Sequence, residues 1–254
     1  MNLKTLASWT AGVCLAVANT PGPVQAQVLS GGAPSWNAAM TRLFGDLKGF
    51  SAKAEMRVTD PAGRPSISVP MNFAMLDDKV RLDIDMTQLK GPQVQSDQVA
   101  LLKQMAMDRV ACIVMPDKRA RHIIFPALAA YVEMPLPEDE VAALNHDFKL
   151  HKTPLGKETI DGHPCVKNRV VMGDAKGQTG EAVVWNATDL KEFPVQMQMN
   201  DKDGAVIVRY TEVHLGRPDA KQFVTPAGFI KHTDMQQLMM AVVQKQKGSQ
   251  GGKK

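Results

Sequence analysis

A histidine and a cysteine two residues apart are the side chains in this sequence best placed to do chemistry. His163 and Cys165 flank a proline, and on an extended strand residues two apart point to the same face. A thiol beside an imidazole is a possible nucleophile or metal pair. The same tripeptide also fits a turn leading into a strand whose cysteine is in a disulfide, and we favour this second interpretation.

Other groups of reactive residues lack the spacing that their chemistry needs. The sequence has no G-x-S-x-G nucleophile motif and no phosphate-binding or dinucleotide-binding glycine pattern. His146 and His151 are five residues apart, whereas a helical metal pair needs a spacing of four. Asp83 and Asp85 alternate with apolar residues, and residues 138–140 are all acidic, so we expect both groups to be solvated. We therefore predict that the protein is not an enzyme and binds no metal and no cofactor.

Positive charge is concentrated at residues 118–122 and at the C-terminal end. Nucleic-acid binding needs a basic face with interleaved aromatic side chains, and aromatic residues make up only 5% of this chain. We therefore predict no nucleic-acid partner. The basic hairpin at 118–122 and the basic residues 246–254, which we predict to be a disordered tail, are suited to weak, salt-sensitive contact with an anionic membrane surface.

Residues 1–26 have the pattern of a secretory signal peptide. Lys4 supplies a positive start, residues 6–18 form an uncharged apolar run, and Val24 and Ala26 are small residues at the positions that a signal peptidase recognises. The apolar run is too short to be a stable membrane anchor. We therefore predict cleavage after Ala26 and a periplasmic protein.

Removal of the signal peptide removes Cys14 and leaves two cysteines, Cys112 and Cys165. An oxidising compartment favours a disulfide between them. Closing a loop of this length would stabilise the fold by roughly 4 kcal/mol. Two unpaired thiols, one of them buried in a strand, are the alternative.

The periodicity of apolar residues predicts one continuous domain at residues 35–245, preceded by a linker at 27–34. Helical spacing occurs at the start of this domain, after Ser96, and after the capping sequence that begins at Thr233. Residues 126–150 show no regular period and are predicted to be irregular. Two-residue alternation predicts about nine or ten antiparallel strands, at residues 56–58, 67–75, 80–86, 110–115, 121–125, 157–160, 166–172, 181–185, 195–199 and 205–215.

The order of these elements and several short motifs resemble the LolA-like group of cell-envelope proteins, within it a branch of domains that have no assigned activity. The motifs are residues 50–56, 156–167, 184–185, 193–195 and 225–229. The resemblance implies an α+β fold in which a strongly curved antiparallel sheet, an incomplete β-barrel, is covered by amphipathic helices. It also implies an apolar cavity that shelters acyl chains.

Methionine is the residue type that we expect to line such a cavity. The chain has 16 methionines, and thioether side chains adapt to ligands of variable shape. The alternation of the strands and the stripe of the last helix direct the following residues towards the concavity: Met71, Phe73, Met75, Leu82, Ile84, Met86, Met197, Met199, Met235 and Met239.

The predicted function is that of a non-catalytic periplasmic binding module. Its partner would be a lipid or the acyl chains of a lipidated protein, and we expect a monomer. The alternative is a cell-envelope protein-interaction or sensor domain in which the concave face is a filled core.

Overall fold

The computed structural model describes residues 38–92, 94–137, 140–141, 149–173, 179–201 and 204–251. The predicted signal peptide and linker lie outside these residues. Within them, no helix is both long enough and apolar enough to cross a membrane.

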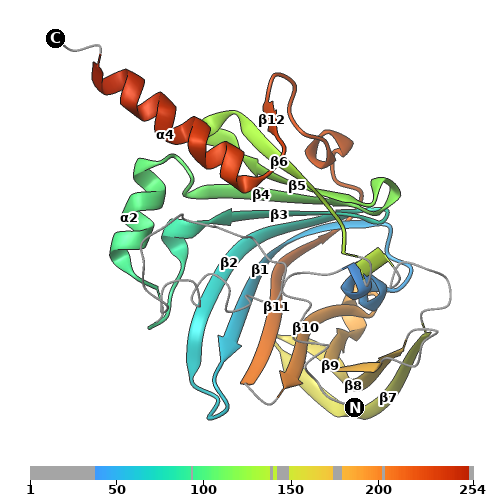
Figure 1. Ribbon diagram of the computed structural model, residues 1–254. Coiled ribbons are helices and arrows are strands. Elements are labelled where there is room, and N and C mark those ends of the chain that lie inside the picture. Colours follow the sequence, from blue (N-terminus) through green and yellow to red (C-terminus); the bar gives the residue numbers. More distant parts are fainter. Residues whose placement is uncertain are drawn as a thin grey trace.

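One twelve-stranded sheet forms the body of the protein (Figure 1), with the strand order β12-β6-β5-β4-β3-β2-β1-β11-β10-β9-β8-β7. All neighbouring strands are antiparallel except β12 and β6, which are parallel. The strands are β1 (Gly49–Thr59), β2 (Pro65–Leu76), β3 (Lys79–Asp85), β4 (Arg109–Met115), β5 (Ala120–Phe125), β6 (Ala130–Pro135), β7 (Lys149–Ile160), β8 (His163–Gly173), β9 (Thr179–Ala187), β10 (Phe193–Asp201), β11 (Gly204–Leu215) and β12 (Ile230–His232).

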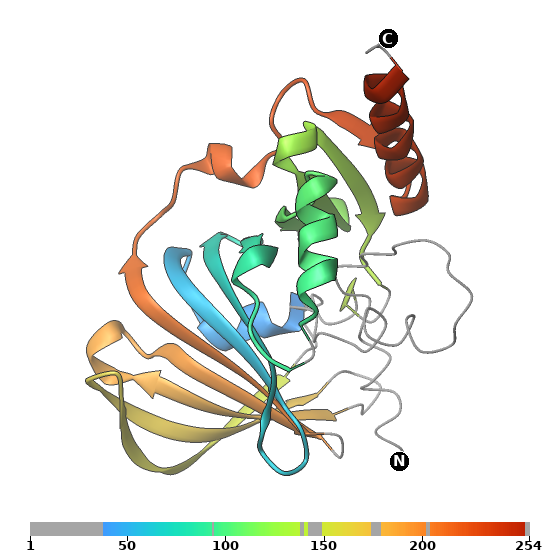
Figure 2. The same ribbon diagram turned by 90° about the vertical axis from the view of Figure 1, so that its left-hand side faces the viewer.

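The sheet is strongly curved and does not close (Figures 1 and 2). Register shifts interrupt the pairing of β1 with β11, of β9 with β10 and of β7 with β8. An unpaired extra residue at such a shift bends its strand and increases the local twist. Strands β12 and β7 remain at opposite ends of the strand order, so the predicted curved, open antiparallel sheet is confirmed.

Alternation along the strands places one apolar face inside the curve. Phe50, Met75, Val80 and Val114 are consecutive register partners on β1, β2, β3 and β4, and all four are buried. Partners in an antiparallel ladder share a face. The main apolar cluster of the protein therefore runs across the concave side of the sheet.

The prediction that amphipathic helices cover this face is not confirmed. The described residues contain two α-helices: α2 buries only Leu102, while α4 contacts β6 and β12 at the edge of the sheet and projects away from it (Figure 1). The first predicted helix is a seven-residue 3-10 helix. The helices are η3 (Ala38–Phe44), η4 (Met86–Gln88), α2 (Ser96–Gln104), η5 (Pro116–Lys118), η6 (Pro126–Leu128), η7 (Thr188–Leu190), η8 (Ala220–Phe223) and α4 (Met235–Gly251).

Helix α4 begins one residue later than its capping sequence suggested. Asp234 Oδ1 accepts a hydrogen bond from the Gln237 amide at 2.7 Å, and Gln237 Oε1 accepts one from the Thr233 amide at 2.7 Å. These bonds satisfy backbone donors that the first turn of a helix leaves free. The helix continues to Gly251, so most of the stretch predicted as a disordered tail is helical.

The prediction of an irregular segment at 126–150 is wrong for its first part, which forms η6 and β6. Two similar turns precede β5 and β6. Arg119 and Ala129 each have a φ of 49°, and their amides donate to the carbonyls of Pro116 and Pro126. A left-handed residue closes each turn and returns the chain as the next strand. Strand β6 was not predicted from the sequence.

Residues 216–229, which we call the strap, cross the convex face of the sheet. Phe223 packs against Ala74 and Leu76, and Phe229 packs against an apolar cluster that contains Ile113 and Ile124. The strap leads from the central strand β11 to β12 at the far edge (Figure 2). It therefore covers apolar side chains that the outer face of the sheet would otherwise expose.

His122 anchors the strap to the sheet. Its Nδ1 lies 2.6 Å from Thr225 Oγ1 and its Nε2 lies 2.9 Å from Glu133 Oε2. Hydrogen bonds from Lys231 and His122 lower the pKa of Glu133 below its ordinary value of 4.5. The stabilisation that the ionised Glu133 carboxylate provides is therefore present above pH 4.5. It is lost as the pH falls through the lowered pKa that Glu133 has in the folded state. A hydroxyl, an imidazole and a carboxylate also form catalytic triads, but here they join the strap, β5 and β6.

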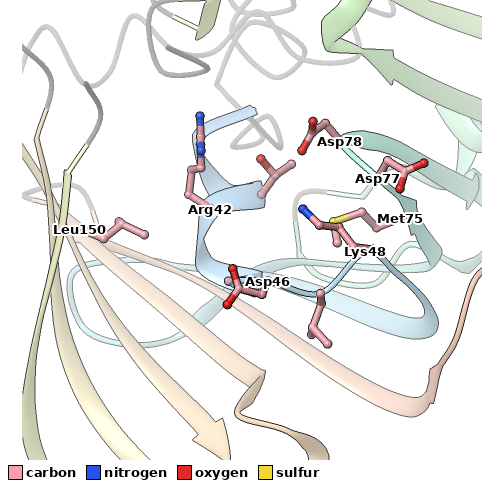
Figure 3. A pocket seen from close by; sticks show the side chains of 10 residues that line it. Arg42, Asp46, Lys48, Met75, Asp77, Asp78 and Leu150 are labelled. Carbon is pink, nitrogen blue, oxygen red and sulfur yellow. The ribbon is translucent and has the colours of Figure 1, made fainter. Parts of the chain in front are cut away.

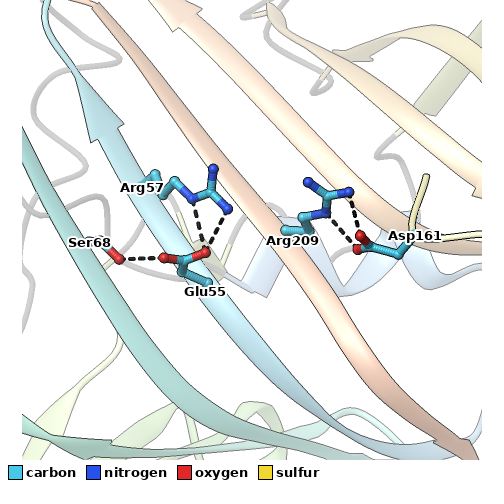
Figure 4. Close-up of polar contacts among 5 residues, drawn as sticks. All are labelled: Glu55, Arg57, Ser68, Asp161 and Arg209. Carbon is cyan, nitrogen blue, oxygen red and sulfur yellow. Dashed lines mark hydrogen bonds and ion pairs between the residues drawn. The ribbon is translucent and has the colours of Figure 1, made fainter. Parts of the chain in front are cut away.

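Charged pairs occupy the rest of the convex face (Figure 4). Arg57 donates two hydrogen bonds to one oxygen of Glu55, and Ser68 donates to the other. Partial burial raises the pKa of Glu55, but the hydrogen bonds from Arg57 and Ser68 outweigh it and lower the pKa below 4.5. Arg209 forms a two-bond contact with Asp161, which ties the β7–β8 turn to β11.

The predicted disulfide between Cys112 and Cys165 is wrong, because both thiols are free and buried. Cys112 lies on β4 and Cys165 on β8, and six strands stand between them in the sheet. A disulfide needs Cα atoms within about 7 Å of each other. The order of strands therefore separates the two cysteines that were predicted to pair.

We expect two free thiols per chain when protein lacking residues 1–26 is denatured without reductant and titrated. The Cys165→Ser variant should give one. Fewer than two thiols in the parent chain would contradict the separation of the cysteines.

We expect Thr225→Val to lower the free energy of unfolding by about 1–3 kcal/mol, because it leaves the buried Nδ1 of His122 without its partner. Urea-induced unfolding measures this. The matched control is Thr188→Val, which removes an exposed hydroxyl bonded to the Pro164 carbonyl and should cost about 1 kcal/mol or less. Equal losses in the two variants would refute the role of Thr225 as an anchor.

Candidate functional site

All ten residues predicted to line the concavity lie in or against the main apolar cluster. Four are buried within it: Phe73, Met75, Leu82 and Met197. Six are partly exposed and pack against it: Met71, Ile84, Met86, Met199, Met235 and Met239. The structure therefore brings the ten residues together and divides them into a buried group and a partly exposed group.

The buried group surrounds a filled aromatic centre. Phe44 of η3 packs onto the sheet, and its ring centroid lies 4.6 Å from that of Phe50 and 5.8 Å from that of Phe73. Phe193 and Tyr210 complete the group, and both contact Phe44 and Phe50. This part of the concave face is a packed core, as the alternative prediction required.

Four members of the partly exposed group, Met71, Ile84, Met86 and Met199, belong to a surface that we call the apolar band, whereas Met235 and Met239 lie on helix α4. The band consists of Val58, Ile67, Met71, Ile84, Met86, Met199 and Val206. Ile67 pairs with Val58, Val58 pairs with Val206, and Val206 pairs with Met199. These four residues form one row across β2, β1, β11 and β10, a width of about 14 Å at ordinary strand spacing. The band lies on the concave face beside the aromatic centre, and its side chains are partly exposed.

A cavity of about 340 Å³ opens beside η3, at the end of the concave face where β2 turns into β3 (Figure 3). Its lining is mainly polar, and Met75 is the one predicted lining residue that reaches it. Arg217 hydrogen-bonds Asp77 and holds the pKa of that carboxyl below its usual range. The cavity is lined by Thr41, Arg42, Gly45, Asp46, Leu47, Lys48, Met75, Asp77, Asp78 and Leu150.

The apolar concave face also carries a buried ion pair. Arg121 of β5 lies between Val114 and Met134, its register partners on the neighbouring strands. Its Nη1 lies 3.8 Å from Glu140 Oε1, and the two side chains are 6% and 3% exposed. Sequence reasoning missed this pair, because it assigned Arg121 to a surface basic cluster and Glu140 to a solvated acidic stretch.

The basic cluster at 118–122 is therefore divided by the sheet. Lys118 and Arg119 are exposed at the turn before β5, whereas Arg121 and His122 are buried on opposite faces of that strand. Side chains on adjacent residues of a strand point to opposite faces. Only the first two remain available for the predicted contact with an anionic surface.

The thiols of this chain are not activated. Burial raises the pKa of Cys112 to about 12 and also raises the pKa of Cys165, so both stay protonated at neutral pH. His163 Nδ1 instead contacts Asp189 Oδ2 at 2.8 Å, and Cys165 Sγ donates to the His163 carbonyl. Over the described residues, no group of three His, Cys, Asp or Glu side chains is arranged to hold a metal. His146 lies outside those residues.

A buried hydroxyl also lies on the concave face. Tyr210 Oη has no hydrogen-bond partner among the described residues, and burial raises its pKa well above the ordinary value. The phenol is therefore neutral. It sits within the aromatic centre and not on the apolar band.

We expect Met197→Trp and Met199→Trp to differ in stability. Met197 is fully buried, so the larger side chain overpacks the core and lowers the free energy of unfolding by about 1–3 kcal/mol. Met199 is partly exposed at the end of the band, so we expect a loss below about 0.5 kcal/mol. Urea-induced unfolding of both variants checks this, and an equal loss would mean that the band is as tightly packed as the core.

Comparison with known proteins finds similarity only among solved structures: no family model and no curated protein matches the chain. A LolA superfamily protein from Nitrosomonas europaea is 10% identical, with a TM-score of 0.43 over 73% of this chain and 94% of that one. The lipoprotein LppX from Mycobacterium tuberculosis is 12% identical, with a TM-score of 0.38 over 71% and 96%. MucB in complex with MucA(peri) is 13% identical, with a TM-score of 0.36 over 74% and 58%.

These structures include the LolA-like group that the sequence motifs resemble. The apolar band, the aromatic centre and the buried ion pair are the features of this chain that bear on its function.

Proposed function

We propose that this protein is a non-catalytic binding module that holds an acyl chain, from a lipid or a lipidated protein, on the apolar band. The observation that carries the proposal is the row of partly exposed apolar residues that pair across four strands, Ile67, Val58, Val206 and Met199. A row of this kind on the inside of a curved sheet offers a continuous apolar track to a chain-like ligand.

The driving force for such binding is the removal of acyl surface from water. Each buried methylene group contributes about 0.8 kcal/mol. Met71, Met86 and Met199 supply flexible thioether contacts that adjust to chains of different shape. We further propose that the protein acts outside the cytoplasm, on the basis of the signal-peptide pattern in residues 1–26.

A protein-interaction or sensor domain is the second candidate, and the filled aromatic centre favours it. Phe44 occupies the middle of the concave face and contacts four other aromatic rings. A domain of this kind would use its outer surface, and no acyl chain would be needed on the band.

The test is to purify the protein under native conditions, extract it with organic solvent and identify the extracted lipids by mass spectrometry. We expect acyl lipids in the extract. We also expect the delipidated protein to bind the apolar dye N-phenyl-1-naphthylamine, with fluorescence enhancement as the readout. A clean extract together with no dye binding would overturn the proposal and favour the interaction domain.

A pair of substitutions on adjacent residues assigns the binding to the band. Met199→Glu places a charge on the band and should weaken dye binding about tenfold or more, because the carboxylate must be desolvated. Gln198→Glu adds the same charge on the opposite face of β10 and should leave binding unchanged. Equal effects of the two substitutions would exclude the band as the binding surface.

A further inference from the structure

We infer that Arg121 is the residue that selects the ligand, and that the ligand is an amphiphile with an anionic oxygen group, a carboxylate or a phosphate. This inference rests on the proposed function and names the chemical class of what the concave face holds. In the absence of ligand, Glu140 occupies the position of the ligand's anionic group.

The first support is the position of Arg121 in the sheet. Val114 and Met134 flank it in register, and Cys112 lies one row away on the same face. All three belong to or pack against the main apolar cluster. A guanidinium that is only 6% exposed among such neighbours has lost its hydration and must be compensated by an anion.

The second support is the incomplete pairing of the guanidinium. Its contact with Glu140 is 3.8 Å long, and Arg121 Nε has no hydrogen-bond partner among the described residues. A guanidinium has five N–H donors in a planar fork that matches the two oxygens of a carboxylate or phosphate. The other arginine–carboxylate contacts show what that match looks like: Arg209 donates to both oxygens of Asp161, at 2.7 and 2.8 Å.

The third support is the origin of Glu140. Arg121 is held on β5 by ladders on both sides, one residue from the start of that strand, whereas Glu140 lies outside the sheet, beyond the end of β6. Glu140 is therefore the member of the ion pair that an incoming anion can replace. When an anionic ligand takes its place, the charge facing Arg121 stays the same and the fork gains two short hydrogen bonds. The ligand is therefore recognised by its head at Arg121 and by its chain on apolar surface.

Energetics give a reason to regard the pair as functional. Replacing a buried ion pair by apolar side chains of similar volume is often neutral or stabilising. Among the ion pairs of the described residues, Arg121 with Glu140 is the pair in which both side chains are less than a tenth exposed. Because stability alone does not require the buried Arg121–Glu140 pair, we attribute its presence to a role in binding.

The experiment compares three single-chain probes with delipidated protein: oleate, lysophosphatidylglycerol and neutral monoolein, each below its micelle concentration, by isothermal titration calorimetry. We expect the parent chain to bind the anionic probes more tightly than monoolein. Arg121→Gln should weaken binding of the anionic probes about tenfold or more while leaving monoolein unchanged. Glu140→Gln should strengthen anionic binding, because the internal competitor has lost its charge.

Arg209→Gln is the matched control, since it removes the same charge from the convex face, and it should leave all three affinities unchanged. If Arg121→Gln fails to fold because the buried Glu140 carboxylate loses this cationic partner, the double variant Arg121→Met with Glu140→Leu removes both charges and keeps a packed core. The double variant should show the same loss of preference for anions.

The outcomes distinguish the role of Arg121 in selecting the ligand from the proposed function of binding an acyl chain. Binding of oleate alone or of the lysophospholipid alone identifies the carboxylate or the phosphate as the recognised group. Equal binding of all three probes, unchanged in the Arg121 variants, overturns the role of Arg121 and leaves the apolar binding module standing. No binding of any probe to any variant overturns the proposed function itself.

Discussion

The alternation of side chains along bulged antiparallel strands is the constraint on which this structure depends. It places every second residue of a strand inside the curve, where register partners on neighbouring strands join into apolar rows. Bulges then bend the sheet enough for those rows to enclose a common space. The packed aromatic centre around Phe44 and the partly exposed band ending at Met199 are two regions of this one face, and among the described residues η3 packs on the first of them.

The chain covers the two faces of the sheet by different means. On the convex side the strap inserts two phenylalanines, Phe223 and Phe229, and is held by the hydrogen bonds of His122. On the concave side η3 supplies Phe44, and α4, which follows the edge strand β12, supplies Leu238 and Val242 to the main cluster. One continuous segment from β11 to α4 thus passes from the outer face, around the edge, to the inner apolar cluster, which explains why a three-residue parallel strand is built there.

Buried charge gives the concave face its chemical character. The Cys112 thiol and the Tyr210 phenol on this face are neutral because burial raises their pKa values. Arg121 is different, since a guanidinium remains charged in proteins and needs an anion at close range. This requirement is the basis of the proposal that the concave face binds an anionic amphiphile, with its head group at Arg121 and its chain on apolar surface.

The sequence by itself determined the features that depend on local period: the strand faces, the ten side chains directed to one cluster, helix α2 and the capped start of α4. Only the tertiary structure decided which strands became neighbours, because pairings such as β1 with β11 join residues far apart in the chain. Those pairings separated Cys112 from Cys165, placed β12 at the edge, and buried Arg121 beside Glu140. The alternation of side chains along a strand determines which face each side chain occupies. The residues that it contacts on that face are set by the long-range order of the strands and by the elements that pack against the sheet.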